Sequence, residues 1–227
     1  MSPSTPLDNI AWHALTGLQS GFAAGRGGAR RFAPGYSPIL GFEDRGSPDF
    51  AALQGFCEAG ESFYCLHWIG PVPPGWCLEQ QAAVRQMVRA PALPDTIDPI
   101  GLRPLVAADV AQATALAQLT RPGPFGPRTI ELGEYFGAFD GDRLVAMAGE
   151  RMAAGRFREI SAVCTHPDAR GRGLARRLLA HLLARQHGRG LTSFLHVMDD
   201  NPRAIRLYES LGFASRSVDP VRVVRYL

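Results

Sequence analysis

The stretch "HPDARGRGLARRLLAHLLARQ", residues 166 to 186, joins a proline break, a glycine turn and a leucine-rich segment. Gly171 and Gly173 stand just where the leucine periodicity begins. Glycine is unfavourable inside a helix, but it lets backbone N–H groups approach a ligand, and a helix start carries partial positive charge. Three arginines add full charges beside the turn: Arg170, Arg172 and Arg176. The stretch therefore predicts a strand–turn–helix unit that binds an anion.

Regular elements alternate on both sides of this stretch. Strands are predicted over 100–106, 134–140, 143–152, 157–165, 191–198 and 221–227, with a hairpin turn at Gly141 and Asp142. Helices are predicted over 107–119, from residue 174 to about 188, and over 201–212. In the last helix Asn201 is the N-cap and Gly212 lies past the end. The pattern predicts an α/β (α+β) domain with a mixed, twisted sheet and flanking helices.

The first part of the chain is less regular. The proline-rich residues 91–99 indicate a linker, which divides the chain into a region 1–96 and a domain 97–227. A short helix is expected from Asp8 or Asn9, and a strand over 62–70. Residues 79–89 fit either a helix or a strand. Residues 21–38 are expected to form a flexible loop, and the glycine-rich residues 17–35 have the composition of a mobile cover. This region is expected to contribute surface on the acceptor side of the site.

Composition narrows the possible functions. The chain has 227 residues, 46% apolar content and a net charge of +3, and no apolar run approaches a membrane span. We expect a cytoplasmic protein that binds neither membrane nor nucleic acid. All 24 basic residues are arginine, which excludes a phosphate-loop lysine and a lysine Schiff base.

The four cysteines form no CxxC pair. Cys57, Cys65, His67 and Cys77 could gather around zinc, but their spacing matches no common zinc motif. We expect buried or idle thiols and no metal.

Three anionic ligands compete for the glycine turn. A nucleoside triphosphate needs the lysine that the chain lacks. A dinucleotide needs a third glycine where Arg176 stands, and too few residues follow to complete a doubly wound sheet. Coenzyme A remains.

The residues also carry a family resemblance. "RGRGLA", residues 170–175, resembles the Q/R-x-x-G-x-G/A loop of the GNAT superfamily of acyl-CoA-dependent N-acyltransferases. Arg170, Gly173 and Ala175 stand at its three defining positions. "DNPRAIRLYESLGF", residues 200–213, is similar to the asparagine-to-tyrosine motif that follows in that family. The resemblance covers roughly residues 98–227 and implies the GNAT fold. One interpretation of region 1–96 is a degenerate GNAT-like half, as in glycine N-acyltransferase-like proteins.

This resemblance implies an acetyl-CoA site. The strand before the loop is expected to splay from its neighbour, so that Val163, Cys164 and Thr165 offer backbone groups to the pantetheine arm. Asn201 would hydrogen-bond the same arm. The pyrophosphate would lie on the main-chain N–H groups of the turn, whose members are Gly171, Arg172, Gly173, Leu174, Ala175 and Arg176.

The implied reaction is direct attack of a primary amine on the thioester in a ternary complex. Tyr208 matches the family's acid and lies nearly two helical turns, about 10 Å, after Asn201. It could equally be a packed core residue. For the base, His196 and Glu150 are candidates, and a structural role for His196 is the alternative.

Two other functions stay open at this point. One is a CoA-binding regulatory protein without catalysis, and the other is an arginine-rich nucleic-acid-binding module. The acceptor is a small-molecule or peptide amine whose identity the sequence does not give, and the protein is expected to be a monomer or a homodimer.

Overall fold

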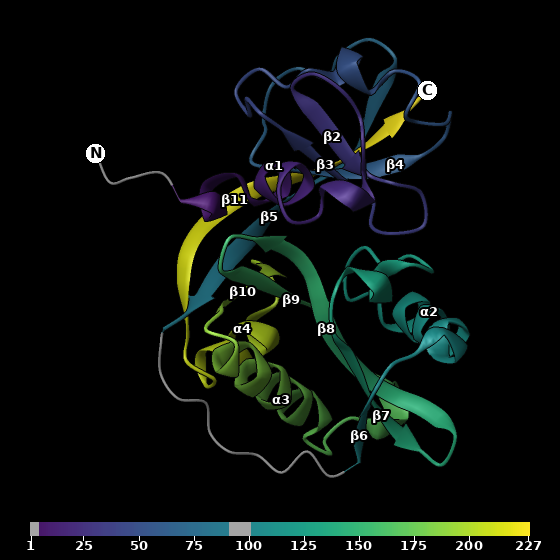
Figure 1. Cartoon of the computed structure of the whole chain (residues 1–227), viewed down its shortest axis with the longest axis vertical. Helices are drawn as coiled ribbons and strands as arrows, with labels where there is room; N and C mark the ends of the chain where they lie inside the picture. Colours follow the sequence, from purple (N-terminus) through teal and green to yellow (C-terminus); the bar gives the residue numbers. More distant parts are fainter. Residues whose placement is uncertain (1–4, 91–100) are drawn as a thin grey trace.

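The computed structural model describes residues 5–90 and 101–227 (Figure 1). Within these residues all strands belong to one sheet, in the order β1-β2-β3-β4-β11-β5-β10-β9-β8-β7-β6. The strands are β1 (Ala23–Ala24), β2 (Ala29–Phe32), β3 (Ile39–Phe42), β4 (Ser62–Leu66), β5 (Trp76–Arg89), β6 (Leu102–Pro104), β7 (Tyr135–Asp140), β8 (Arg143–Ala154), β9 (Phe157–Thr165), β10 (Thr192–Met198) and β11 (Phe213–Tyr226). This mixed sheet with flanking helices confirms the predicted fold class.

Four α-helices flank the sheet in the described part of the chain: α1 (Ile10–Thr16), α2 (Val110–Thr120), α3 (Leu174–Gly188) and α4 (Pro202–Glu209). Short 3-10 turns are η1 (Pro6–Asn9), η2 (Ser20–Phe22), η3 (Phe50–Leu53), η4 (Ala107–Asp109), η5 (Thr129–Leu132) and η6 (Pro167–Ala169). None of the described helices has the length and apolar character needed to cross a membrane.

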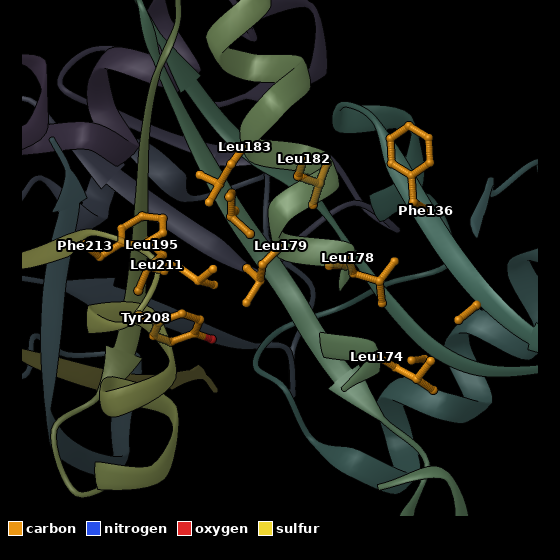
Figure 2. Packing of buried hydrophobic residues seen from close by; sticks show 14 of the residues in the cluster. Phe136, Leu174, Leu178, Leu179, Leu182, Leu183, Leu195, Tyr208, Leu211 and Phe213 are labelled. Atoms are coloured by element: carbon orange, nitrogen blue, oxygen red, sulfur yellow. The ribbon is translucent and has the colours of Figure 1, made fainter. Parts of the chain in front are cut away.

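The leucine periodicity places α3 on the sheet. Leucines at positions 178, 179, 182 and 183 are almost fully buried and pack against β7, β8 and β10 together with α4 (Figure 2). Burying one such side chain contributes about 1.5–3 kcal/mol to folding stability, so burial of these leucines holds α3 against the sheet. On the opposite face of β8, Leu144 and Met147 pack against Leu116 and Ala113 of α2. The helices therefore cover both faces around β8.

Strands β9 and β10 pair over only a short distance. Their parallel register runs from Phe157 and Thr192 to Glu159 and Phe194, and no further pairs follow. From Ile160 onward β9 keeps its antiparallel partner β8 but has no β10 neighbour. The expected splay is thus present, and it leaves main-chain groups of β9 unpaired on the side that faces the gap.

The two sequence regions share the sheet. Strand β5, from before the proline-rich segment, lies between β10 and β11. Strand β11, coloured yellow in Figure 1, runs from α4 up to β4 and the C-terminus. Residues 79–89, which fitted a helix or a strand, are therefore strand. The predicted linker at 91–99 lies outside the described residues, and the division at 96/97 stays a prediction.

The prediction of a flexible loop over 21–38 is wrong. Ala23–Ala24 and Ala29–Phe32 pair as a hairpin, and β2 continues into the sheet beside β3. Phe32 is fully buried, and Arg31 is buried against Glu61 at 2.6 Å. Gly25, Gly27 and Gly28 made this segment look mobile, but they lie in the turn between β1 and β2. Ala29 and Phe32 of β2 are buried by contacts with residues far away in sequence.

Candidate active site

A groove of about 670 Å³ runs along the end of β9, the glycine turn and the start of α4. All but one of the residues predicted to bind the coenzyme line it. The exception is Arg172, whose guanidinium pairs with Asp140 at 3.3 Å on the surface. The two sequence motifs, separated by α3 and β10 in the chain, therefore form the two walls of one groove.

The glycine turn has the backbone that an anion site needs. Gly171 and Gly173 have φ angles of +78° and +72°, which non-glycine residues rarely adopt. A Cβ at either position would meet no atom of the described protein within 4 Å, so both backbones face open space. Gly173 is also the N-cap of α3 and supplies no side-chain cap. The first N–H groups of α3 are therefore available to a ligand.

Positive charge surrounds the turn. The arginines that line the groove are Arg170, Arg176 and Arg203. The groove contains no carboxylate among its described lining residues. The charge, the glycine backbone and the helix start together suit a pyrophosphate group.

A second cavity of about 350 Å³ adjoins the groove. Four residues line both spaces: Val163, Asn201, Ala204 and Tyr208. The second cavity has side chains from both sequence regions, including Tyr64 of β4 and Gln80 of β5. The arrangement can hold one ligand in the groove and a second in the cavity, with their ends meeting beside Tyr208.

A bulge in β9 lies where the two spaces meet. Met147 and Gly149 of β8 pair with Cys164 and Ser161, so β9 has one more residue than β8 between the two pairs. Ala162, within the bulge, has a φ of +53°. A bulge interrupts the strand pairing locally and changes the direction in which the backbone N–H and C=O groups point. Strain at this non-glycine residue fits a site where backbone orientation serves binding.

Tyr208 projects from α4 at the edge of the leucine core, with its hydroxyl pointing away from the helix (Figure 2). Its ring packs edge-on against Phe213 at 6.0 Å, and the side chain lines both the groove and the second cavity. Burial raises its pKa to about 12. The side chain thus combines packing with a protonated hydroxyl at the cavity junction, and the two predicted roles do not exclude each other.

Asn201 caps α4 and lines both spaces. Its Oδ1 accepts from the Ala204 N–H at 3.1 Å, as the N-cap prediction required. Its Nδ2 has no partner among the described residues and can donate to a ligand carbonyl.

His196 lines the second cavity, but both of its ring nitrogens are engaged. Arg216 donates to Gln86 Oε1 at 3.0 Å, which turns the Gln86 amide nitrogen toward His196 Nε2 at 3.3 Å. Because an amide nitrogen only donates, Nε2 accepts, and the proton is on Nδ1, 2.8 Å from Glu159. This is the structural role that the sequence left open as an alternative.

Glu159 holds His196 and Arg151 together beneath the cavity. Although burial alone would raise the pKa of this fully buried carboxyl, Arg151 and His196 lower it to about 2. Arg151 Nε and Nη2 donate to its two oxygens at 2.9 and 2.8 Å. The network fixes the strands β8, β9 and β10 where they diverge.

Glu150 does not line the groove or the second cavity. It is buried under the C-terminal end of α3, where Gln186 and Arg189 donate to it at 2.9 and 2.5 Å. The structure therefore does not bring this candidate base to the other site residues.

Cys164 is the cysteine that lines the groove, and burial raises its pKa to about 11. Its thiol is thus poorly suited to act as a nucleophile, which needs the thiolate. Among residues 5–90 and 101–227, no three His, Cys, Asp or Glu side chains are placed to hold a metal ion.

Known proteins share this architecture. The sequence model of the acetyltransferase (GNAT) family matches residues 115–213. A crystal structure of a putative GNAT-family acetyltransferase from Novosphingobium aromaticivorans is 36% identical, has a TM-score of 0.87, and matches 99% of this chain and 100% of its own. The chain belongs to the GNAT family of N-acetyltransferases. This membership supports an N-acetyltransferase enzyme, and enzymes of this family use acetyl-CoA as cosubstrate and act on amine acceptors.

Two curated relatives of this GNAT enzyme extend the comparison. The [ribosomal protein bS18]-alanine N-acetyltransferase of Salmonella typhimurium is 32% identical over 121 residues, which are 48% of this chain and 78% of that protein. An uncharacterized protein of Mycobacterium leprae is 34% identical over 189 residues, which are 77% of this chain. The chain spans about half the length of the M. leprae relative.

Sequence reasoning missed the second cavity of this GNAT enzyme. Arg121, Arg151 and Ser161 line it, yet none belongs to a motif. Pro122 and Pro124 follow Arg121, but nothing in the sequence indicated which cavity this segment borders.

Proposed function

We propose that this protein transfers the acetyl group of acetyl-CoA directly to a primary amine, with both substrates bound together. The observation that carries the proposal is the junction at Tyr208, where the groove and the second cavity meet. Acetyl-CoA would occupy the groove and the amine the cavity. The amine nitrogen forms a bond to the thioester carbonyl carbon, the carbon–sulfur bond breaks, and the proton lost by nitrogen balances the one gained by sulfur.

The groove residues would bind the cosubstrate in two parts. The N–H groups at the start of α3 would hold the pyrophosphate, assisted by Arg170 and Arg176. The pantetheine arm would pair with the unpaired backbone of β9 from Val163 to Thr165, as an added strand does. Asn201 Nδ2 would donate to an amide carbonyl of the arm.

The bulge in β9 supports stabilisation of the tetrahedral intermediate. Backbone N–H groups around Ala162 would point at the oxyanion, where preorganised donors contribute most to catalysis. We include no acyl-cysteine intermediate, because the raised pKa of Cys164 keeps its thiol protonated and therefore poorly nucleophilic.

Tyr208 would donate its hydroxyl hydrogen to the departing sulfur. Its pKa of about 12 keeps it protonated at neutral pH. A free thiol has a pKa near 8.5, so the phenol would stabilise the thiolate through a hydrogen bond and regain any proton that it gives up. We assign no side chain as the base, since His196 is fully hydrogen-bonded and Glu150 lies elsewhere.

Replacing Tyr208 by phenylalanine tests the proposal. The variant keeps the packing against Phe213, so acetyl-CoA affinity should stay within a factor of about two while kcat falls about 10²-fold. Calorimetric titration gives the affinity, and thiol release with a panel of amines gives the rate. Full activity of the variant would contradict the role of Tyr208. Tight acetyl-CoA binding without turnover on any amine would instead support a regulatory CoA-binding protein.

The nucleic-acid alternative finds less support. Several arginines of the segment 170–189 pair with carboxylates of the chain itself, including Arg172 with Asp140 and Arg185 with Glu134. Their charge is therefore partly neutralised within the protein.

A further inference from the structure

The charge of the second cavity points to the acceptor. This step rests on the proposed function, because it assigns the acceptor to that cavity. None of the described residues that line it is an aspartate or a glutamate. A site that recognised its substrate as a cationic amine would offer a carboxylate to the ammonium group. The cavity has guanidinium groups instead.

Arg121 is the first of these. It is the C-cap of α2, with φ of +49° and its N–H bonded to the Ala117 carbonyl at 2.8 Å. The following Pro122 and Pro124 restrict the chain on its other side. Its guanidinium is exposed and has neither a hydrogen bond nor an ion pair with any described residue. The backbone is fixed, and the charge remains available.

Arg151 is the second. Its side chain is only 8% exposed, and Glu159 fixes its Nε and Nη2. Its Nη1 has no hydrogen-bond partner in the described chain, although the residue lines the cavity. This N–H group can therefore donate to a ligand in the cavity.

Part of the cavity lining is apolar. It is formed by Ala82 and Val84 of β5 and by Val221 and Val223 of β11. An occupant that fits this lining has an anionic group and a short apolar part.

We propose that the acceptor is a free amino acid with an apolar side chain. Its carboxylate would bind Arg121 and Arg151 Nη1, its side chain would contact the apolar lining from β5 and β11, and its amine would face Tyr208. The nearby positive charge also disfavours the protonated amine, so the attacking form is promoted without a dedicated base. A peptide N-terminus fits less well, because an amide replaces the carboxylate and offers no anion to Arg121 and to Arg151 Nη1.

The test compares amino acids with their carboxamides. At saturating acetyl-CoA, initial rates are measured for each of the twenty amino acids, the matching carboxamides and short peptides. The carboxamide amine loses its proton more easily, so a preference for the acid cannot come from amine basicity. We expect kcat/KM for the best apolar amino acid to exceed that of its carboxamide at least tenfold.

Arg121→Gln supplies the second arm. It should raise KM for the amino acid about tenfold, leave kcat unchanged, and leave the carboxamide unaffected. Arg26→Gln removes the same charge from the exposed β1–β2 turn, outside both the groove and the second cavity. It should change neither KM nor kcat for either substrate.

Several results would overturn the inference. One is an equal kcat/KM for the amino acid and its carboxamide. Another is an equal effect of Arg121→Gln on the KM values of both, and the last is turnover confined to peptides or polyamines. In the last case the proposed acetyltransferase function would stand. Absence of turnover on every amine, despite acetyl-CoA binding, would overturn both.

Discussion

Replacing Gly173 by alanine separates the two uses of the glycine turn, local conformation and ligand approach. Gly173 has φ of +72°, and an added Cβ would touch no described atom. The cost to folding is therefore conformational, about 1–2 kcal/mol for an L-residue in the left-handed region. In a chain of this size each kcal/mol lowers Tm by about 2–4 °C, so we expect a fall of about 2–8 °C.

The same methyl group should weaken acetyl-CoA binding by a different mechanism. Because Gly173 lines the groove and its Cβ would point into open space, the methyl would occupy volume that the pyrophosphate needs. We expect Kd to rise at least tenfold, or about 1.4 kcal/mol, measured by calorimetric titration well below Tm. Gly173→Glu, which adds negative charge, should weaken binding further.

Gly190 provides the matched control. It follows the other end of α3, has φ of +68°, and would also place a Cβ in open space, but it lines neither the groove nor the second cavity. Gly190→Ala should therefore lower Tm by a similar amount and leave Kd unchanged. If the two variants bind acetyl-CoA equally well, the reasoning that places the pyrophosphate at the glycine turn is refuted.

Three further predictions concern buried groups. Because burial raises the pKa of Tyr208 to about 12, its ionisation should not reduce the rate between about pH 8 and 10, and a basic limb that disappears in Tyr208→Phe would contradict this. Glu159→Gln leaves Arg151 buried without its counter-charge, so the free energy of unfolding measured in urea should fall by about 3–5 kcal/mol. Glu131→Gln, at the exposed pair with Arg128, should lower the free energy of unfolding far less. The pKa of Glu159 is lowered in the folded state, so its stabilising contribution is present above about pH 4.5 and is lost as pH falls toward 2; thermal melts over this range should show a loss that Glu159→Gln lacks.

Local sequence signals sufficed to place the elements that form the groove. Gly171 and Gly173, the leucine spacing of α3, and Asn201 followed by Pro202 each state a backbone preference within a few residues. These preferences do not depend on distant contacts, so the turn and the two helices could be placed before the fold was known. The resemblance to the GNAT family then supplied the ligand.

Tertiary structure decided the second cavity. The position of β5 between β10 and β11 depends on strand pairings between residues more than a hundred positions apart, which periodicity does not encode. The same holds for side-chain partners. His196 was a candidate base until Gln86 and Glu159 were found on its two nitrogens, and Arg121 had no assigned role until the fold placed it beside a cavity without carboxylates. The sequence by itself determined where the chain turns and which faces are apolar, while the packing of distant strands determined which polar groups are satisfied and which remain free to bind a substrate.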